Sequence, residues 1–311
     1  MKPYKKNNFI SLKSFSPDAL RDLVRLTAKT KKNKTFYEKS LAGKFVGLLF
    51  EKPSLRTKTS FYLGALGLGA QVIYYSPDEI RLGKRENVSD VANTLSRYLD
   101  IAVLRTFSHK TIEEFAEASP VSTVNALSDK LHPSQVLGDI FTLLELKKDI
   151  PKIKFCYIGD VNNVCHSLLY AFSILGGNIY VATAKGYEPD SHILKECRNI
   201  AAETKATIEI SNSPLQCASR ADVIYTDVWA SMGKEKERSM RKKAFKKFQV
   251  NDKLLSLAKS SCCIMHCLPA HRNEEITDSV LKSKNSIVFL QAENRFYSAQ
   301  AILLWCTGIK K

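Results

Sequence analysis

Residues 44–68, KFVGLLFEKPSLRTKTSFYLGALGL, contain the structural unit that decides the fold. Lys44–Phe50 is a short apolar run rich in β-forming residues, which predicts a buried strand. Ser54–Leu68 has apolar residues at helical spacing, which predicts a helix shortly after that strand. A buried strand followed by a helix is typical of a parallel α/β sheet, because parallel strands need a crossover connection.

The same alternation of strand and helix continues through the chain. Further strands are predicted at Gln71–Tyr75, Ile101–Leu104, Val121–Val124, Ile153–Ile158, Asn178–Ala182, Thr207–Ile210, Val223–Tyr225 and Ile287–Leu290. Further helices are predicted at Val88–Leu99, around Ile112–Ala118, and at Leu137–Leu146, Ser167–Leu175, Asp190–Glu203, Pro214–Ser219, Asp252–Ala258 and 295–311.

The stretch Asp149-Ile150-Pro151 ends a long helix, and a second cycle of strands and helices begins after it. The sequence therefore predicts two doubly wound parallel-sheet domains, 1–148 and 149–295, with helix 296–311 packing back on the first. In such sheets, ligands bind at the carboxyl ends of the strands. We accordingly expect an active-site cleft between the two domains.

The composition limits the classes of protein that the chain can represent. Its 311 residues are 44% apolar and carry 47 Lys and Arg against 31 Asp and Glu, a net charge of +16. This composition excludes a disordered or fibrous chain, and no apolar run approaches the about 20 residues of a membrane span. The basic N-terminus lacks the apolar core of a signal peptide, so we expect a cytoplasmic protein.

The charge is uneven along the chain. Residues 1–60 hold 15 basic and 4 acidic side chains, so this segment carries 15 − 4 = +11 of the total. The excess indicates attraction to anions such as nucleic acid, an acidic membrane or phosphorylated metabolites, or else a lysine-rich solvated surface.

The eight cysteines all lie between Cys156 and Cys306 and show no CxxC spacing. Most are in apolar runs such as 155–157, so we expect small buried hydrophobic side chains in a reducing compartment. Cys267 differs because it follows an apolar run instead of lying within it.

Polar residues of the first half suit an anion. Ser54, Arg56 and Thr57 open a predicted helix, where free backbone N–H groups and the helix dipole attract negative charge. An arginine can also hold a phosphate with two parallel hydrogen bonds. Arg105 ends a predicted strand. An N-cap serine beside exposed arginines would give the same pattern.

His132 and Gln135 lie one helical turn apart, so a carbonyl group and an amide could be bound from one helix face. A lone histidine with a structural role is the alternative.

The second half offers groups for an amine or amide. Asn163 follows the strand that ends in Gly159-Asp160, although a plain turn would also explain the two amides at 162 and 163. Asp227 lies four residues before Ser231-Met232-Gly233, as if to hold an amine. Cys267 and Arg295 follow further apolar runs. A phosphorylated substrate in the first half and an amino compound in the second would explain this division.

Seven segments in this order resemble motifs of the aspartate/ornithine transcarbamylase family, and the resemblance covers essentially the whole chain. They are FEKPSLRTKTSF (50–61), LRTFSH (104–109), HPSQVLGD (132–139), GDVNNVCHSLL (159–169), TDVWASMG (226–233), HCLPAHR (266–272) and ENRFYSAQ (293–300). The SMG and HCLP segments are similar to the ornithine branch of the family, whereas the aspartate branch lacks the SMG loop and carries HPLP.

The resemblance implies transfer of the carbamoyl group of carbamoyl phosphate to the δ-amino group of L-ornithine, giving L-citrulline and phosphate without metal or organic cofactor. It places carbamoyl phosphate on Ser54, Leu55, Arg56, Thr57, Arg105, His132, Gln135, Cys267, Leu268 and Arg295, with ornithine on Asn163, Asp227, Ser231 and Met232. Arg105, His132, Asp227 and Cys267 carry the catalysis in this reading.

The family also implies a homotrimer in which residues 78–84 of a neighbouring chain complete each site. Two positions depart from the family pattern: Leu55 replaces a common threonine, and Arg81 stands where some members have a glutamine. Arg81 is therefore a candidate neighbouring-subunit contact or a solvent-facing residue.

Three alternatives stay open from the sequence. A transcarbamylase acting on putrescine or an N-acylated ornithine would share most motifs, and the +16 charge would also suit a nucleic-acid-binding protein on the same fold. A regulatory pseudoenzyme is disfavoured because the catalytic residue types are present. Synthesis and breakdown of arginine are not distinguished.

Overall fold

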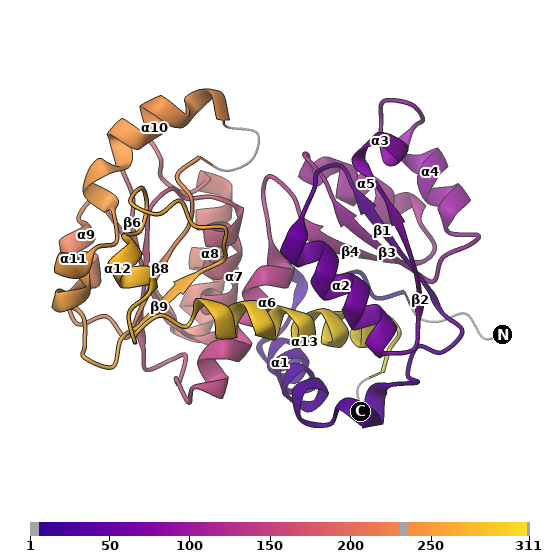
Figure 1. Ribbon diagram of the computed structural model, residues 1–311, viewed down its shortest axis with the longest axis horizontal. Helices are drawn as coiled ribbons and strands as arrows, with labels where there is room; N and C mark the ends of the chain where they lie inside the picture. Colours follow the sequence, from indigo (N-terminus) through magenta and orange to yellow (C-terminus); the bar gives the residue numbers. More distant parts are fainter. Residues whose placement is uncertain (1–5, 231–234, 310–311) are drawn as a thin grey trace. The chain divides into compact units, whose positions relative to one another are not determined.

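The computed structural model describes residues 6–230 and 235–309, and these form two parallel sheets with helices around them (Figure 1). The chain divides into two compact units. The first comprises Met1–Phe141 and Glu293–Lys311, and the second comprises Thr142–Ala292. The predicted fold class, two doubly wound α/β domains, is confirmed. No helix in the described ranges is long and apolar enough to cross a membrane.

The described part of the first unit contains a four-stranded parallel sheet in the order β2-β1-β3-β4. These strands are Gln71–Tyr75 (β2), Phe45–Phe50 (β1), Ile101–Arg105 (β3) and Ser122–Leu127 (β4). β1 and β3 are pleated apolar strands in the middle of the sheet, and the register pairs Phe50 with Arg105. The last residue of β3 is therefore level with the start of the segment that joins β1 to the next helix.

Helices cover this sheet as the strand–helix alternation requires. Those of the first unit are Pro17–Lys32 (α1), Leu55–Gly67 (α2), Pro77–Ile80 (α3), Val88–Leu95 (α4) and His109–Ala118 (α5). α2 packs on β1 and β2, while α5 packs on β4 and against α4. A cluster including Leu49, Leu104, Ile112 and Phe115 forms the core between the sheet and α4–α5.

Two longer helices link the units along the chain. α6, Pro133–Glu145, carries the chain from the first unit into the second, and α13, Val288–Cys306, returns it. Within the first unit, α13 is anchored by hydrogen bonds from Thr30 to the Tyr297 carbonyl (3.2 Å) and from Ser122 to the Cys306 carbonyl (2.9 Å). α2 lies close to α13: a Cβ placed on Gly64 of α2 would be 3.7 Å from the Ala299 side chain of α13.

The second unit is built on a five-stranded parallel sheet, in the order β7-β6-β5-β8-β9, within the described residues. Its strands are Thr207–Ser211 (β7), Asn178–Ala182 (β6), Lys154–Ile158 (β5), Val223–Thr226 (β8) and Cys263–His266 (β9). Successive side chains of β5 point to opposite faces. Phe155 contacts Phe172 of the next helix, whereas Cys156 joins the core on the other face.

The helices of the second unit divide between those two faces. They are Asn163–Leu175 (α7), Ser191–Thr204 (α8), Pro214–Ala218 (α9), Arg238–Phe245 (α10), Asp252–Leu257 (α11) and Asp278–Leu281 (α12). α7 and α8 pack together on the Phe155 side, and residues of α9, α10 and α11 form the cluster on the Cys156 side. A buried ion pair of 2.7 Å joins Arg241 of α10 to Asp160, just after β5.

One predicted strand is wrong. Within the run 287–290, Val288 begins α13, and the Gln291 N–H donates to the Ile287 carbonyl at 2.9 Å. A short run of β-branched and aromatic residues fits a buried strand and a buried helical turn equally well, which explains the error. The last strand is instead β9, Cys263–His266, which the sequence showed only as an apolar run.

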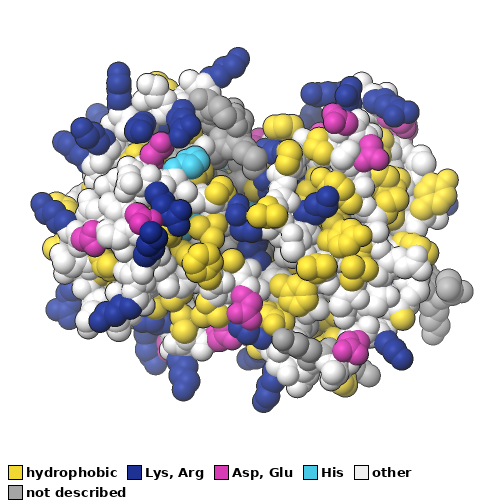
Figure 2. Space-filling model, viewed as in Figure 1, with side chains coloured by type: hydrophobic (Ala, Val, Ile, Leu, Met, Phe, Trp, Pro, Cys, Tyr) yellow, Lys and Arg dark blue, Asp and Glu magenta, His cyan; other side chains and the backbone are white. Residues whose placement is uncertain are grey.

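Part of the charge of the basic N-terminal segment lies on the surface. α1 buries one face that includes Leu20, Leu23 and Leu26, and its last turn carries Lys29, Lys31 and Lys32, where positive charge stabilises the helix C-terminus. Figure 2 shows Lys and Arg side chains scattered over the visible face. This distribution suits a solvated basic surface.

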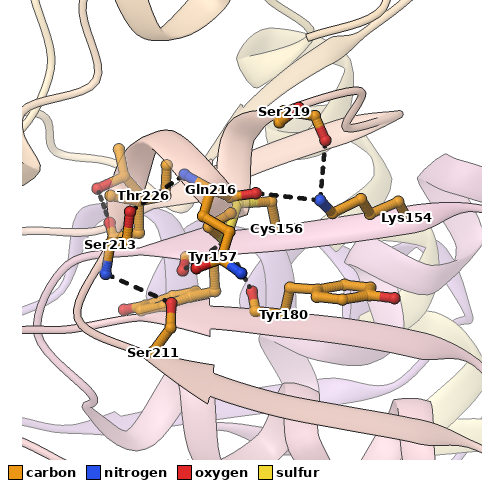
Figure 3. The surroundings of a disulfide bond; sticks show 11 residues. Lys154, Cys156, Tyr157, Tyr180, Ser211, Ser213, Gln216, Ser219 and Thr226 are labelled. Carbon is orange, nitrogen blue, oxygen red and sulfur yellow. Dashed lines mark hydrogen bonds between the residues drawn. A yellow bond between two sulfur atoms is a disulfide. The ribbon is translucent and has the colours of Figure 1, made fainter. Parts of the chain in front are cut away.

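A disulfide joins Cys156 of β5 to Cys217 of α9 (Figure 3). Both residues are buried, so the expectation of reduced, merely hydrophobic cysteines is wrong for this pair. The other six cysteines are free. The two bonded residues are 61 positions apart in sequence, and only the packing of α9 on β5 brings them together. Their spacing therefore carried no signal.

Reduction should destabilise the second unit, because the bond closes a loop of 61 residues in the unfolded chain. Loop-closure entropy for that length corresponds to about 4 kcal/mol, of which proteins usually retain about 2–4. We expect dithiothreitol to lower the thermal unfolding midpoint by about 5 °C or more. The Cys217→Ala variant should not respond to the reductant, and Cys197→Ala, which removes a buried cysteine outside the disulfide, should respond as the wild type does. An equal midpoint with and without reductant in the wild type contradicts the bond.

Candidate active site

The start of α2 forms the first part of the candidate site. Ser54 caps the helix, with its Oγ accepting from the Thr57 N–H at 3.2 Å, which is the helix-capping role that the sequence left as an alternative. Leu55 and Arg56 occupy the first turn, where Leu55 is exposed and Arg56 is half-buried. A helix N-terminus that follows a central strand of a parallel sheet is suited to binding an anion.

Two buried arginines and a buried threonine lie in the same unit. Arg105 is the last residue of β3, and Arg295 belongs to α13. Arg295 Nη2 donates to Thr57 Oγ1 at 2.8 Å, which connects α13 to the first turn of α2. Arg295 therefore reaches the site from a helix, whereas the sequence placed it after a strand.

Arg105 and Arg295 both lie close enough to His132 for their charges to affect its pKa. His132 is buried immediately before α6, and its Nδ1 lies 3.3 Å from Ser134 Oγ. Burial holds the pKa of His132 well below its ordinary value, and the charges of Arg295 and Arg105 lower it further. The imidazole is consequently neutral at physiological pH.

Gln135 follows in the first turn of α6 and is buried. Its Nε2 donates to Asp139 Oδ1 at 2.8 Å, so the orientation of the amide is set by a residue one helical turn further on. The carbonyl end of Gln135 is thereby directed away from Asp139. Sequence reasoning missed Asp139, although a carboxylate four residues after a glutamine on a helix is a recognisable pair.

Arg81 lies apart from these residues on the surface of the first unit. It ends α3 with a φ of 27°, and its guanidinium is 3.7 Å from Asp78. Within this chain, Arg81 is therefore a surface residue paired with a neighbouring carboxylate.

The Asp227 carboxylate is the centre of the candidate site in the second unit. It follows β8 and is buried. Asp227 Oδ1 accepts from the Val228 N–H at 2.8 Å and from Cys267 Sγ at 2.9 Å, and Oδ2 accepts from Asn162 Nδ2 at 2.6 Å. Three donors therefore fix the position of the carboxylate. The predicted proximity of Asp227 and Cys267 is present.

The buried side chains of His266 and Glu275 fix the segment that follows β9. His266 Nδ1 accepts from the Leu268 N–H at 2.9 Å, so the ring proton is on Nε2, which faces Glu275 Oε1 at 3.1 Å. His266 and Glu275 are both fully buried. Leu268 has a φ of 55° and precedes a cis proline. His266 begins the HCLPAHR segment, but nothing in the sequence indicates its role or its contact with Glu275.

Asp227, His266 and Cys267 bring one potential metal-ligand atom each to within 4.8 Å of one another. Both ring nitrogens of His266 already have hydrogen-bond partners, and Cys267 donates to Asp227. The cluster is therefore explained as a hydrogen-bonded network that holds Asp227 and Cys267 in place.

Three further predicted residues belong to this unit. Asn163 is the first residue of α7 and is half-buried. Ser231 and Met232 lie outside the described residues. Asn162 lies directly before Asn163. The sequence indicates only a turn amide at this position, yet the Asn162 side chain contacts Asp227 directly.

Comparison with known proteins identifies the family. The model described as aspartate/ornithine carbamoyltransferase, carbamoyl-P binding domain, matches residues 7–145, and the model of the Asp/Orn binding domain matches residues 151–306. The catabolic ornithine carbamoyltransferase of Thermoplasma acidophilum is 43% identical over 298 residues, which cover 96% of this chain and 97% of that relative.

Solved structures agree with the family models. The ornithine carbamoyltransferase from Pyrococcus furiosus superposes with a TM-score of 0.94 at 40% identity, covering 97% of both chains. The anabolic ornithine carbamoyltransferase from Campylobacter jejuni gives 0.93 at 33% identity, covering 97% of this chain and 99% of that one. Fold and site thus define a carbamoyltransferase. The chain belongs to the aspartate/ornithine carbamoyltransferase family.

The lowered pKa of His132 has a measurable consequence for stability. Well above pH 6.5 the residue is neutral in both the folded and unfolded chain and contributes no pH dependence. As the pH falls below 6.5, the unfolded chain takes up a proton that the folded chain does not, so stability is lost, by up to about 1.4 kcal/mol per pH unit.

We therefore expect the free energy of unfolding to fall less steeply between pH 6.5 and 4.5 in His132→Gln than in the wild type. His192→Gln, which replaces an exposed histidine, serves as the control. Urea denaturation at stepped pH measures the slopes. Parallel slopes for wild type and His132→Gln would show that His132 titrates normally in the folded protein.

Proposed function

We propose that the protein is an ornithine carbamoyltransferase, which transfers the carbamoyl group of carbamoyl phosphate to the δ-amino group of L-ornithine and releases L-citrulline and phosphate. The observation that carries this proposal is the buried Asp227 carboxylate with Cys267 Sγ at 2.9 Å, in a domain that matches the Asp/Orn binding model. A carboxylate beside a thiol, at the carboxyl ends of β8 and β9, is suited to an amine.

In this proposal the first unit binds carbamoyl phosphate. Its phosphate lies at the start of α2 and is held by helix N–H groups, hydroxyls and guanidinium groups from Ser54, Leu55, Arg56, Thr57, Arg105 and Arg295. The helix dipole and the arginines favour the dianionic group and also stabilise the phosphate that leaves.

The carbamoyl group lies against His132 and Gln135. Neutral His132, whose Nδ1 lies 3.3 Å from Ser134 Oγ, polarises the carbonyl oxygen together with Arg105 and Thr57. The Gln135 carbonyl, directed by Asp139, and the Leu268 backbone accept from the carbamoyl amide, and Cys267 lies beside the same group. Preorganised donors to a developing oxyanion contribute about 2.7–4 kcal/mol each in comparable acyl transfers.

The second unit binds ornithine in the same proposal. Asn163, Asp227, Ser231 and Met232 hold the α-amino and carboxylate groups, and Asp227 with Cys267 flanks the δ-amine. The two half-sites serve one reaction, so the amine bound by the second unit attacks the carbon bound by the first. Joint positioning of two substrates lowers the barrier by about 7–11 kcal/mol.

The chemistry balances without further reactants. The δ-amine has a pKa near ~10.4, like lysine, and must lose a proton before its lone pair can attack. A bond forms between the δ-nitrogen and the carbamoyl carbon, and the bond from that carbon to the phosphate oxygen breaks. The nitrogen loses its second proton to the departing phosphate, which leaves neutral citrulline.

A comparison of amines tests the substrate. Purified protein with carbamoyl phosphate should convert L-ornithine to citrulline, measured colorimetrically, at least 100-fold more efficiently than it carbamoylates putrescine or N-acetylornithine. A preference for either of those amines would reject ornithine as the substrate. The relatives include both catabolic and anabolic enzymes, so the proposal concerns the reaction and not the direction of arginine metabolism. The cytoplasmic location stays a prediction.

Two variants should separate the half-sites. Arg56→Ala removes a phosphate-binding guanidinium, so we expect kcat/KM for carbamoyl phosphate to fall at least 100-fold. Asp227→Asn retains the shape but removes the charge, so we expect its main effect on kcat/KM for ornithine. Steady-state kinetics with each substrate varied distinguishes them, with Arg21→Ala and Asp149→Asn as exposed controls. Near-wild-type turnover in Arg56→Ala would exclude the phosphate assignment.

We further propose that the chain assembles as a homotrimer through the first unit and that Arg81 of a neighbouring copy completes each site. The support is an apolar surface on α2 and β2, with Leu63 49%, Leu66 46% and Ile73 45% exposed. Figure 2 shows hydrophobic side chains gathered where Figure 1 places α2 and β2. β2 is also an edge strand, which leaves one side of its backbone available.

The combined substitution Leu63→Glu, Leu66→Glu should break this association, because charges cannot be buried unpaired in an interface. We expect a wild-type mass of three times the 34.9 kDa chain and a lower mass for the variant, by light scattering coupled to size exclusion. Met240→Glu places a charge on an exposed apolar residue of the second unit and should leave the mass unchanged. An unaltered mass in the double variant would show that the subunit interface does not include this surface of α2.

A further inference from the structure

Asn162 connects the start of α7 to the Asp227 carboxylate. It lies in the turn after β5 and is buried. Its Oδ1 accepts from the Val164 and Cys165 N–H groups at 2.9 and 3.2 Å, and its Nδ2 donates to Asp227 Oδ2 at 2.6 Å. One side chain thus caps a helix and contacts the central carboxylate of the second unit.

The orientation of this amide follows from its partners. Backbone N–H groups can only donate, so the oxygen of Asn162 must face α7. The NH₂ group must then face Asp227, which as a carboxylate can only accept. Tyr157 Oη, 3.4 Å from Asn162 Oδ1, lies on the same side as the helix. The donor to Asp227 is therefore fixed by chemistry as well as by position.

Capping alone does not require an asparagine at this position. Serine, threonine and aspartate cap helices as well as asparagine does. In the same unit Asp190 caps α8, Ser213 caps α9 and Thr277 caps α12. Only asparagine joins a cap acceptor to a donor long enough to reach Asp227. The residue type at 162 is thus explained by the carboxylate, not by the helix.

We propose that Asn162 is a positioning residue for the reaction: through its Nδ2–H donor it sets the orientation of Asp227, and thereby the binding and alignment of the amine. This inference rests on the proposed function of Asp227. Asn162 lies in the turn between β5 and α7 and donates to Asp227 Oδ2. Cys267 and the Val228 N–H donate to the other oxygen, Oδ1. Loss of the Asn162 donor leaves the carboxylate held through Oδ1, so Oδ2 can turn away from its present direction.

The charges around this contact determine how it responds to pH. Among the described residues, Tyr157 contacts Asn162, and the titratable groups that act on Tyr157 include Asp160, Cys165, Asp227 and Cys267. His266 and Cys267 also lie close to Asp227. Burial raises the pKa of Tyr157 and of Cys165, so both stay protonated at neutral pH. Asp160 is paired with Arg241, and His266 is engaged by Glu275. Among the residues that the structure describes, these contacts supply no new counterion for a second carboxylate at 162.

Two substitutions separate positioning from capping. Asn162→Asp keeps the cap acceptor but places a second carboxylate against Asp227. At lower pH the two carboxylates can share a proton, whereas at higher pH both are ionised and repel each other. Asn162→Ser keeps the cap but is too short to reach Asp227. Asn251→Asp, at the N-cap of α11, makes the same chemical change at a helix start and is the matched control.

The measurement is kcat/KM for ornithine between pH 7 and 9, expressed as the ratio of variant to wild type, so that ionisation of ornithine itself cancels. For Asn162→Asp we expect the ratio to fall at least tenfold from pH 7 to pH 9. For Asn162→Ser we expect a loss of about tenfold at every pH. The KM for carbamoyl phosphate should stay within twofold of wild type in both variants, and Asn251→Asp should give a ratio near one throughout.

A flat ratio for Asn162→Asp in an active enzyme overturns the proposal, as does an equal effect on carbamoyl phosphate. A wild type that makes no citrulline overturns the proposed function instead. A crystal structure of Asn162→Asp at pH 9 then gives a readout without activity. The proposal expects Asp227 Oδ1 to have left hydrogen-bond distance of Cys267 Sγ, and an unchanged contact overturns it.

Discussion

The parallel pairing of strands is the constraint on which both candidate half-sites depend. Because neighbouring parallel strands end at the same edge of a sheet, side chains distant in sequence meet there without any local motif. In the first unit, Arg105 ends β3 beside the segment that leads from β1 into α2. In the second, Asp227 follows β8 and Cys267 follows β9, its hydrogen-bonded neighbour. The sheets therefore supply the positions, and the side chains supply the chemistry.

The two half-sites differ in charge in the way that the proposed reaction needs. Burial, reinforced by the charges of Arg295 and Arg105, lowers the pKa of His132 and keeps it neutral, so it adds no positive charge to the phosphate-binding region. The second unit centres on a carboxylate that three donors hold in place. Supporting residues do comparable work in each: Asp139 orients Gln135, and Asn162 orients Asp227. An activated acyl phosphate and an amine have the matching charges.

Much of this could be predicted from sequence, because apolar periodicity reports burial and parallel α/β topology is regular. Strand Gln71–Tyr75 has the predicted bounds, and α2 begins directly after Ser54, where the predicted helix begins. The failures involve information that is not local. Ile287–Leu290 has the composition of a strand but continues into α13, and the partner of Cys156 lies 61 residues away. The contact of Asn162 with Asp227 spans 65 positions and depends on the β5–β8 pairing.

The central claim is that carbamoyl carbon activated by the first unit passes directly to an amine nitrogen held by the second. The most direct measurement is NMR of the product formed from ¹³C-carbamoyl phosphate and ornithine carrying ¹⁵N at the δ position. The account predicts a single new carbonyl resonance, split by one-bond coupling to that nitrogen. A labelled carbon that appears as carbonate or cyanate, or bonded to a different nitrogen, would contradict it.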